Sequence, residues 1–367
     1  MHRFSKCADH PNSILVNGVK LPVTILGDAA FFSFGGLTSV TIGTNVTRIG
    51  NSTFLLCWNL RNVTIPNSVT SIGSSAFDGC TSLRNITIPN SVTIIGDDAF
   101  YNCQRLGGVT IPNSVTNIGT SAFAYCTSLT SITIPNSITT LPDNLFSVCT
   151  SLSSVIIPNS VTSIGSAFGG CTSLRNVVIP NSVTNIGYEA FASCTGLRSV
   201  TIPNSVTCIG EFVFYNCTSL TSITIPSSVT SIGNDAFSQC PSLTGVYFEG
   251  NAPSIGVYVF LGDNNVTVYY LLGTTGWSYF LSQVSILGAL WNPLIQTGDG
   301  SLGVQTNQFG FNINWASGQT VVVEACTDLA NPIWSPVGTN TLPGGSSYFS
   351  DPQWTNYPGR FYRIRSP

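Results

Sequence analysis

Nine cysteines recur at a nearly constant interval and are the first candidates for chemistry. The interval is 23 residues, apart from one of 22 residues. If successive units stack, these thiols form a straight column, whereas a metal ion needs ligands that converge on one point. Disulfides between adjacent units remain an alternative, but a reduced internal column is favoured because cysteine is often fully buried. The column comprises Cys57, Cys80, Cys103, Cys126, Cys149, Cys171, Cys194, Cys217 and Cys240.

Three further cysteines lie off this column. Cys208 occupies a unit position that holds serine or asparagine in several other units, as at Ser71 and Asn117. We therefore expect its thiol to face solvent and to be the one most open to reaction, with an inert exposed thiol as the alternative. The other two are Cys7 and Cys326.

The residues needed for catalysis are sparse. Both histidines, His2 and His10, precede the repeats, so a serine or cysteine nucleophile there has no imidazole base. A glycosidase needs two carboxylates around a pocket. The aspartates and glutamates of the repeats instead recur at similar unit positions, which places them along an exposed edge. The sequence predicts no enzyme, no catalytic residue, no cofactor and no metal site. The acids are Asp97, Asp98, Asp143, Glu189, Glu211 and Asp235.

The outward face of one strand in each unit offers the best candidate for binding. A threonine recurs at its centre, and a regular column of hydroxyls can bind an ordered partner such as a glycan. The alternative is a plain sheet surface, because threonine favours strands on its own account. The candidate column comprises Thr64, Thr87, Thr110, Thr133, Thr201 and Thr224, and Ile156 and Val178 interrupt it.

Two pairs of arginines stand beside this column in neighbouring units, namely Arg61 with Arg84 and Arg175 with Arg198. Guanidinium groups pair well with carboxylate or sulfate, so these pairs predict binding of such groups. A solvated strand edge is the alternative, since exposed charges contribute little on their own.

The composition excludes several classes of partner. Only 7% of the 367 residues are charged, and the formal net charge is −3. Without a basic excess, the chain lacks the electrostatic footprint of a nucleic-acid or anionic-membrane binder. No stretch reaches the roughly 18 apolar residues that a membrane-spanning helix requires. The first residues contain no apolar core of the kind that a secretory signal carries.

The elements that position these side chains follow from the period. A repeat of this length marks a solenoid, in which each unit buries its apolar face only against its neighbours. In one unit, Ile132 and Ile134 alternate with polar residues as in a half-buried strand, and Pro135 ends that strand. Ile138 then re-enters the core, and a recurring phenylalanine, such as Phe123, fills the interior.

The period divides this mainly β chain into four parts. Residues 1–20 form a leader or partial cap, 21–272 the solenoid of parallel strands, 273–300 a connector and 301–367 a C-terminal domain. One unit is a residue shorter, and its deletion is expected in a corner between Gly165 and Ala167. In the last part, Phe309, Phe311 and Ile313 alternate along one strand face, which predicts a small β-sandwich-like domain.

One unit shows the full pattern of apolar, proline, glycine and cysteine positions. Its residues are Leu83, Ile86, Ile88, Pro89, Ser91, Val92, Ile95, Gly96, Ala99, Phe100 and Cys103. In this pattern the unit resembles the BspA-like (Treponema pallidum-type) bacterial leucine-rich repeat. The resemblance implies a curved solenoid with a parallel sheet on its concave side, usually secreted or displayed on the cell surface and used for adhesion or other recognition. No catalytic residues come with it.

The C-terminal part contains the stretches VVVEACTDLANPIWSPVGTNTL at residues 321–342 and YFSDPQWTNYPGRFYRIR at residues 348–365. In these stretches it resembles the β modules of secreted Verrucomicrobia-like repeat proteins, which implies an anchoring or sorting element. The leading hypothesis for the whole chain is a non-enzymatic, extracellular or cell-surface recognition protein that binds a protein or a glycan through the solenoid face. A self-assembling extracellular structural protein is the alternative. Ice or crystal binding through the threonine column is a third hypothesis, to which a curved face is poorly suited.

Overall fold

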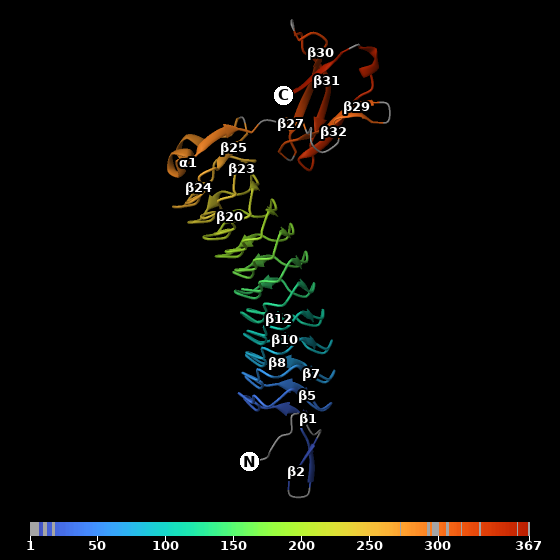
Figure 1. Cartoon of the computed structure of the whole chain (residues 1–367), viewed down its shortest axis with the longest axis vertical. Helices are drawn as coiled ribbons and strands as arrows, with labels where there is room; N and C mark the ends of the chain where they lie inside the picture. Colours follow the sequence, from blue (N-terminus) through green and yellow to red (C-terminus); the bar gives the residue numbers. More distant parts are fainter. Residues whose placement is uncertain are drawn as a thin grey trace.

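In the computed structural model, the chain forms a long stack of thin layers with a small β domain at its C-terminal end (Figure 1). The structure describes residues 7–9, 13–16, 19–271, 273–291, 294–295, 301–305, 308–316, 318–329, 332–357 and 359–365. Each layer is one unit of about 23 residues, and the solenoid has about 12 turns. The fold is mainly β, as predicted, and the helices of the described residues are α1 (Trp277–Val284) and the 3₁₀ helix η1 (Trp354–Asn356).

Each layer contributes one short strand to a parallel front sheet, which carries the threonine column. The strands pair in register within four groups, so that Thr87 lies beside Thr110 and Thr201 beside Thr224. Between these groups the strand pairing is interrupted. The central residue of a strand, such as Ile132, is buried and its two neighbours face solvent. The front strands are β5 (Ser39–Thr41), β7 (Asn62–Thr64), β9 (Asn85–Thr87), β11 (Gly108–Thr110), β13 (Ser131–Thr133), β15 (Ser154–Ile156), β17 (Asn176–Val178), β19 (Ser199–Thr201), β21 (Ser222–Ile225), β23 (Gly245–Phe248), β25 (Thr267–Tyr270) and β26 (Leu287–Leu290).

The second segment of each layer forms a two-residue strand of a parallel side sheet. The glycine after this strand donates its N–H to the preceding layer, as Gly119 does to Ile95 and Gly165 to Leu141. Pro142 occupies the equivalent position and has no N–H, so the side sheet is interrupted between β12 and β14. The side strands are β4 (Ile25–Leu26), β6 (Arg48–Ile49), β8 (Ser71–Ile72), β10 (Ile94–Ile95), β12 (Asn117–Ile118), β14 (Thr140–Leu141), β16 (Ser163–Ile164), β18 (Asn185–Ile186), β20 (Cys208–Ile209), β22 (Ser231–Ile232) and β24 (Ser254–Ile255).

A corner segment joins each side strand to the cysteine and bonds the layers through its backbone. Ser75 and Gly79 donate their N–H groups to the carbonyl oxygens of Asp97 and Tyr101 in the next layer, over 2.7 and 2.9 Å. Both donors have left-handed backbone, with φ of 53° and 69°. The corners therefore form a third hydrogen-bonded ladder beside the two sheets.

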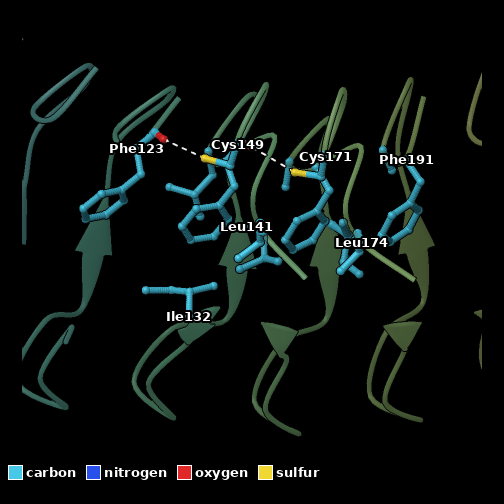
Figure 2. Close-up of a cluster of buried hydrophobic side chains, with 14 of the residues drawn as sticks. Phe123, Ile132, Leu141, Cys149, Cys171, Leu174 and Phe191 are labelled. Carbon is cyan, nitrogen blue, oxygen red and sulfur yellow. Dashed lines mark hydrogen bonds between the residues drawn. The ribbon is translucent and has the colours of Figure 1, made fainter. Parts of the chain in front are cut away.

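The interior is filled by a ladder of phenylalanines and a ladder of cysteines (Figure 2). The rings of successive layers stack with centroids 5.2 to 5.9 Å apart, from Phe31 to Phe260. Each ladder thiol donates a hydrogen bond to a phenylalanine carbonyl of an earlier layer, as Cys149 does to Phe123 over 3.2 Å. All nine ladder cysteines are buried and free, which confirms the predicted internal column.

Both ends of the solenoid carry strands outside the repeat. Near the N-terminus, β1 (Cys7–Asp9) pairs with β5, and β2 (Ser13–Val16) forms a hairpin with β3 (Val19–Pro22), where the sequence predicts only a partial cap. At the other end, β26 pairs with β25, so the front sheet runs into the predicted connector. The α1 residues Trp277 and Phe280 pack edge-on against Phe248 of the last layers.

The C-terminal domain consists of two antiparallel sheets around one core. In the first sheet β29 pairs with β27, β28 and β32, and in the second β30 pairs with β31 and β33. Phe311, Ile313, Val321, Val323 and Phe349 are buried together, so both sheets contribute to the core, as in a small sandwich. The strands are β27 (Leu294–Ile295), β28 (Gly303–Gln305), β29 (Gln308–Asn314), β30 (Thr320–Cys326), β31 (Ser335–Thr341), β32 (Ser346–Asp351) and β33 (Phe361–Arg365).

Candidate functional site

A series of hollows follows the front sheet between two columns of polar side chains, and we call it the asparagine trough. One column is the threonines of the front strands, and the other is the asparagines of the Pro-Asn-Ser turns that follow those strands. Three cavities of about 580, 530 and 620 Å³ lie along it. The trough asparagines, all exposed, are Asn67, Asn90, Asn113, Asn136, Asn159, Asn181 and Asn204.

Most repeated hydroxyls of the solenoid are used by the fold itself. Ser182, which follows Asn181, donates to the carbonyl oxygen of Val161 over 2.6 Å, and Ser91 makes the same bond to Val69. The threonines that immediately precede the side strands, such as Thr93 and Thr184, also donate to carbonyl oxygens of the preceding layer. These side chains hold neighbouring layers together.

The side chains of the trough take no part in such bonds. Within the described residues, neither the trough asparagine amides nor the six candidate threonine hydroxyls make a hydrogen bond. The turn does not require asparagine either, because Asn90 lies second in a turn closed by the N–H of Val92 and the carbonyl of Pro89, a position that most residues tolerate. Nor does Asn90 have a positive φ. These polar groups are therefore free to bind a ligand.

The six candidate threonines are exposed on the front sheet, as the alternation predicts. Thr110 and Thr133 line the first cavity, and Thr201 and Thr224 line the third. The remaining two, Thr64 and Thr87, continue the column beyond the described cavities.

At its C-terminal end the trough becomes a cleft against the C-terminal domain. The indole N–H of Trp315 donates to the carbonyl oxygen of Trp291 over 2.7 Å, and the ring of Trp291 lies 5.0 Å from that of Tyr247. Leu271 of the solenoid is buried in the core of the C-terminal domain. These contacts hold the two walls of the cleft together. Its lining includes Asn181, Thr201, Asn204, Thr224, Glu249, Trp291, Asn312, Asn314, Trp315 and Ser346.

The trough carries almost no charge. Glu249 is the single charged side chain among the described residues that line its three cavities. In the middle of the trough, Ile156 and Val178 replace threonine and are 63% and 74% exposed. A ligand would therefore meet amides, hydroxyls and aliphatic surface.

The four candidate arginines lie outside these cavities. Arg61, Arg84, Arg175 and Arg198 are exposed, each three residues before the central column of the front sheet. The N–H of Arg198 donates to the carbonyl oxygen of Arg175 over 2.8 Å, so these two stand in adjacent layers. Their binding of carboxylate or sulfate stays a prediction.

The thiols divide as the sequence predicts. Cys208 is exposed on β20. Burial raises the pKa of Cys149 and Cys194 to about 12, so these thiols stay protonated and unreactive. Cys326 is buried in the C-terminal domain, and the side chain of Cys7 lies outside the described residues.

The corner acids support the backbone. Asp97 and Asp143 accept the N–H groups of Thr120 and Ser166 in the next layer, over 2.8 and 3.1 Å. Among the described residues, no three histidine, cysteine, aspartate or glutamate side chains gather as a metal site would need. His2 and His10 lie outside the described residues. No helix in the described part of the chain is long and apolar enough to cross a membrane.

Sequence reasoning missed the asparagine column and the cleft. The signal for the column is present, because Pro-Asn-Ser recurs with an asparagine that neither the turn nor an interlayer bond requires. The cleft leaves no such signal, since Trp291 and Asn312 come from a part without a period and meet the solenoid only through folding.

The stacked layers, the parallel front sheet and its open trough define a bacterial-type leucine-rich-repeat solenoid. A model of the BspA type leucine rich repeat region matches residues 3–106, 24–153, 71–198 and 139–267, and the chain belongs to this family. The matched ranges end before the C-terminal domain, so its likeness to Verrucomicrobia-like modules stays a prediction.

Several solved structures are similar to this chain. A leucine-rich repeat protein from Bacteroides ovatus has 30% identity over 72% of this chain and 86% of that chain, with a TM-score of 0.42. A leucine rich repeat protein of T. pallidum has 29% identity over 53% and 79%, with a TM-score of 0.42. A leucine rich cell surface protein from Faecalibacterium prausnitzii has 26% identity over 78% and 87%, with a TM-score of 0.45. None of the curated proteins matches the chain.

Proposed function

We propose that this protein is a non-enzymatic recognition protein, secreted or displayed on the cell surface, that binds a protein or a glycan in the asparagine trough. One observation carries the proposal. Seven asparagine amides and six threonine hydroxyls recur along one open face without a hydrogen bond in the described residues, while the neighbouring serines bond to the fold.

The family and the electrostatics support this proposal. Membership of the BspA type leucine rich repeat family is the reason to expect recognition at an extracellular site. The cavities of the trough contain one carboxylate, Glu249, and no described histidine or cysteine beside it. General acid–base or nucleophilic catalysis needs a second positioned group, so the trough suits binding better than turnover.

The test is a binding screen with a variant whose trough is blocked. Wild-type protein and the double variant Thr110→Lys, Thr133→Lys are applied to a glycan array and to a panel of extracellular-matrix proteins. The double variant Asn117→Lys, Thr140→Lys is the matched control, because it adds the same charge in the same two layers at exposed positions of the side strands β12 and β14.

The proposal predicts a ligand that the wild type and the control retain and that the blocked variant loses at least tenfold, the effect of roughly 1.4 kcal/mol. Wild-type protein that stays at background on every spot, or a blocked variant that binds as the wild type does, would overturn it.

A second candidate function is self-association through the last front strand. β26 is an edge strand of the front sheet, and Leu287 on it is 79% exposed. Exposed apolar edge strands favour pairing with another chain. The candidate predicts that sedimentation of the wild type shows concentration-dependent oligomers and that Leu287→Lys gives monomers. Monomeric wild type at the highest attainable concentration would remove it.

A further inference from the structure

We propose that the ligand of the asparagine trough is a neutral glycan chain of β-linked sugars that lies along the stacking direction, with one end in the cleft beside Trp291. This assignment names a ligand class for the proposed function and rests on it. It is argued from the period, the charge and the surface chemistry of the trough.

The period of the trough suits sugars better than a peptide. Stacked strands repeat about every 4.8 Å, so each layer presents one asparagine and one column residue at that interval. A pyranose ring in an extended β-linked chain is about as long as one such step, so each layer meets one sugar. Alternate rings of a β-1,4 chain are turned over, so the same sugar edge recurs at every second layer. A peptide strand brings a side chain to the same face only about every 6.6 Å and drifts out of register.

The charge of the trough selects a neutral chain. Its described lining contains one carboxylate and no cation, and the candidate arginines stand outside the cavities. An anionic glycan would find no guanidinium or ammonium partner among the described residues of that lining. Amides and hydroxyls are the groups that bond sugar hydroxyls without fixed charge.

The two kinds of surface in the trough match the two surfaces of a sugar ring. Asn159 and Asn181 present amides toward the second cavity, and Ile156, Val178 and Pro180 present apolar surface in it. A pyranose ring offers hydroxyls at its edge and C–H groups on its face, so it can meet both at once.

The aromatic end of the trough fits the end of such a chain. In the cleft, Trp291 presents an indole ring that packs against Tyr247, which in turn stacks on Tyr269 at 4.7 Å. Trp291 lines the cavity and its ring is held by Tyr247, so we propose that it packs against the C–H face of a terminal sugar.

The test is titration calorimetry of the full chain with β-1,4-linked glucose oligosaccharides from disaccharide to hexasaccharide. Affinity is expected to rise with chain length, because each added sugar meets another layer. Asn159→Ala together with Asn181→Ala should weaken hexasaccharide binding about 25-fold, taking each lost hydrogen bond as about fivefold. Ser160→Ala together with Ser182→Ala is the matched control, since these serines bond to Ile138 and Val161 within the fold.

Two further measurements test where the end of the glycan binds and whether the trough prefers a neutral glycan. Trp291→Ala should weaken the binding of the longest oligosaccharide at least tenfold, which corresponds to roughly 1.4 kcal/mol of binding free energy. Because Trp291→Ala also removes the ring contact with Tyr247, Trp291→Phe is measured beside it and should keep most of the affinity. The bond from Trp315 to the backbone carbonyl of residue 291 is kept in both variants. A sulfated heparin hexasaccharide should bind more weakly than the neutral hexasaccharide.

The outcomes separate this assignment from the proposed function. Affinity that is independent of length, or heparin binding as tight as that of the neutral chain, would overturn the neutral glycan. A matrix protein that binds wild type but not the blocked variant, with no neutral oligosaccharide bound, would overturn the glycan and leave the proposed function standing. Absence of any trough-dependent ligand in the screen overturns both.

Discussion

The Sγ atom of Cys171 donates a hydrogen bond to the carbonyl oxygen of Phe146 over 3.2 Å, across the one unit that lacks a residue. The same carbonyl accepts the N–H of Cys149 within its own layer, also over 3.2 Å. The deletion is absorbed in the corner, where Ala167 donates to Gly165 over 2.7 Å, two residues back. The thiol thus satisfies a buried carbonyl even where the period changes, so the cysteine ladder has a polar role besides packing.

Truncation of a ladder thiol should destabilise the solenoid. Cys171→Ala removes the donor to Phe146 and leaves a small cavity beside the phenylalanine ladder, so we expect a loss of about 1–3 kcal/mol in the free energy of unfolding. Urea denaturation under reducing conditions measures it. Cys208→Ala is the matched control on an exposed thiol and should change stability by less than about 0.5 kcal/mol. Equal effects of the two variants would contradict a buried ladder.

Thiol labelling should distinguish the two classes of cysteine. In a Cys7→Ser background, native protein is expected to react rapidly at Cys208 alone with an alkylating reagent, because burial keeps the ladder thiols protonated and covered. Mass spectrometry counts the labels before and after denaturation. Rapid native labelling that persists in Cys208→Ala would show that the ladder is open to solvent.

Stability should fall as pH rises from about 4 to about 7. Burial raises the pKa of Asp263 from 3.8 to about 7, and burial with the nearby Asp98 raises that of Asp78 to about 6. Both carboxyls bind protons more tightly in the folded chain than in the unfolded one. Their stabilising contribution is therefore complete below about pH 4 and is lost as pH rises through the folded values.

The geometry at Asp263 explains its part in this dependence. Asp263 occupies the next ladder position after Cys240, and its Oδ1 atom accepts the Cys240 N–H over 2.5 Å. Its Oδ2 atom is buried and has no hydrogen-bond partner among the residues that the structure describes. Asp263→Asn keeps the acceptor and cannot ionise, so urea midpoints at pH 5 and pH 8 should differ less than in the wild type. Asp78→Asn should remove a separate part of this difference in urea midpoint. If the difference between pH 5 and pH 8 stays as in the wild type in both variants, the assignment is refuted.

The sequence predicted those parts of the fold that repeat. The period placed Cys149 and Phe123 inside and Thr110 and Thr133 outside, because alternation within a unit and equivalence between units both constrain those positions. The left-handed corner residues were not predicted, since Ser75 shows no glycine or asparagine signal. The strands β1 to β3 are too short for a periodic pattern.

The candidate site was predicted only in part. The threonine column came from strand alternation, but the asparagine and the serine of the Pro-Asn-Ser turns, such as Asn181 and Ser182, were not among the predicted binding residues. Only coordinates separate the two, because the serine hydroxyl bonds to Val161 and the asparagine amide bonds to no described residue. The cleft at Trp291 joins parts of the chain that no local pattern relates.

The central claim is that adjacent residues of the same turn have different tasks, Asn181 for the ligand and Ser182 for the fold. The most direct test measures the dissociation constant of Asn181→Ala and Ser182→Ala for the strongest binder of the screen, together with urea stability. We predict that Asn181→Ala weakens binding about fivefold with stability unchanged, and that Ser182→Ala costs about 1 kcal/mol of stability with binding unchanged. The reverse pattern, or wild-type affinity in Asn181→Ala, would contradict the account.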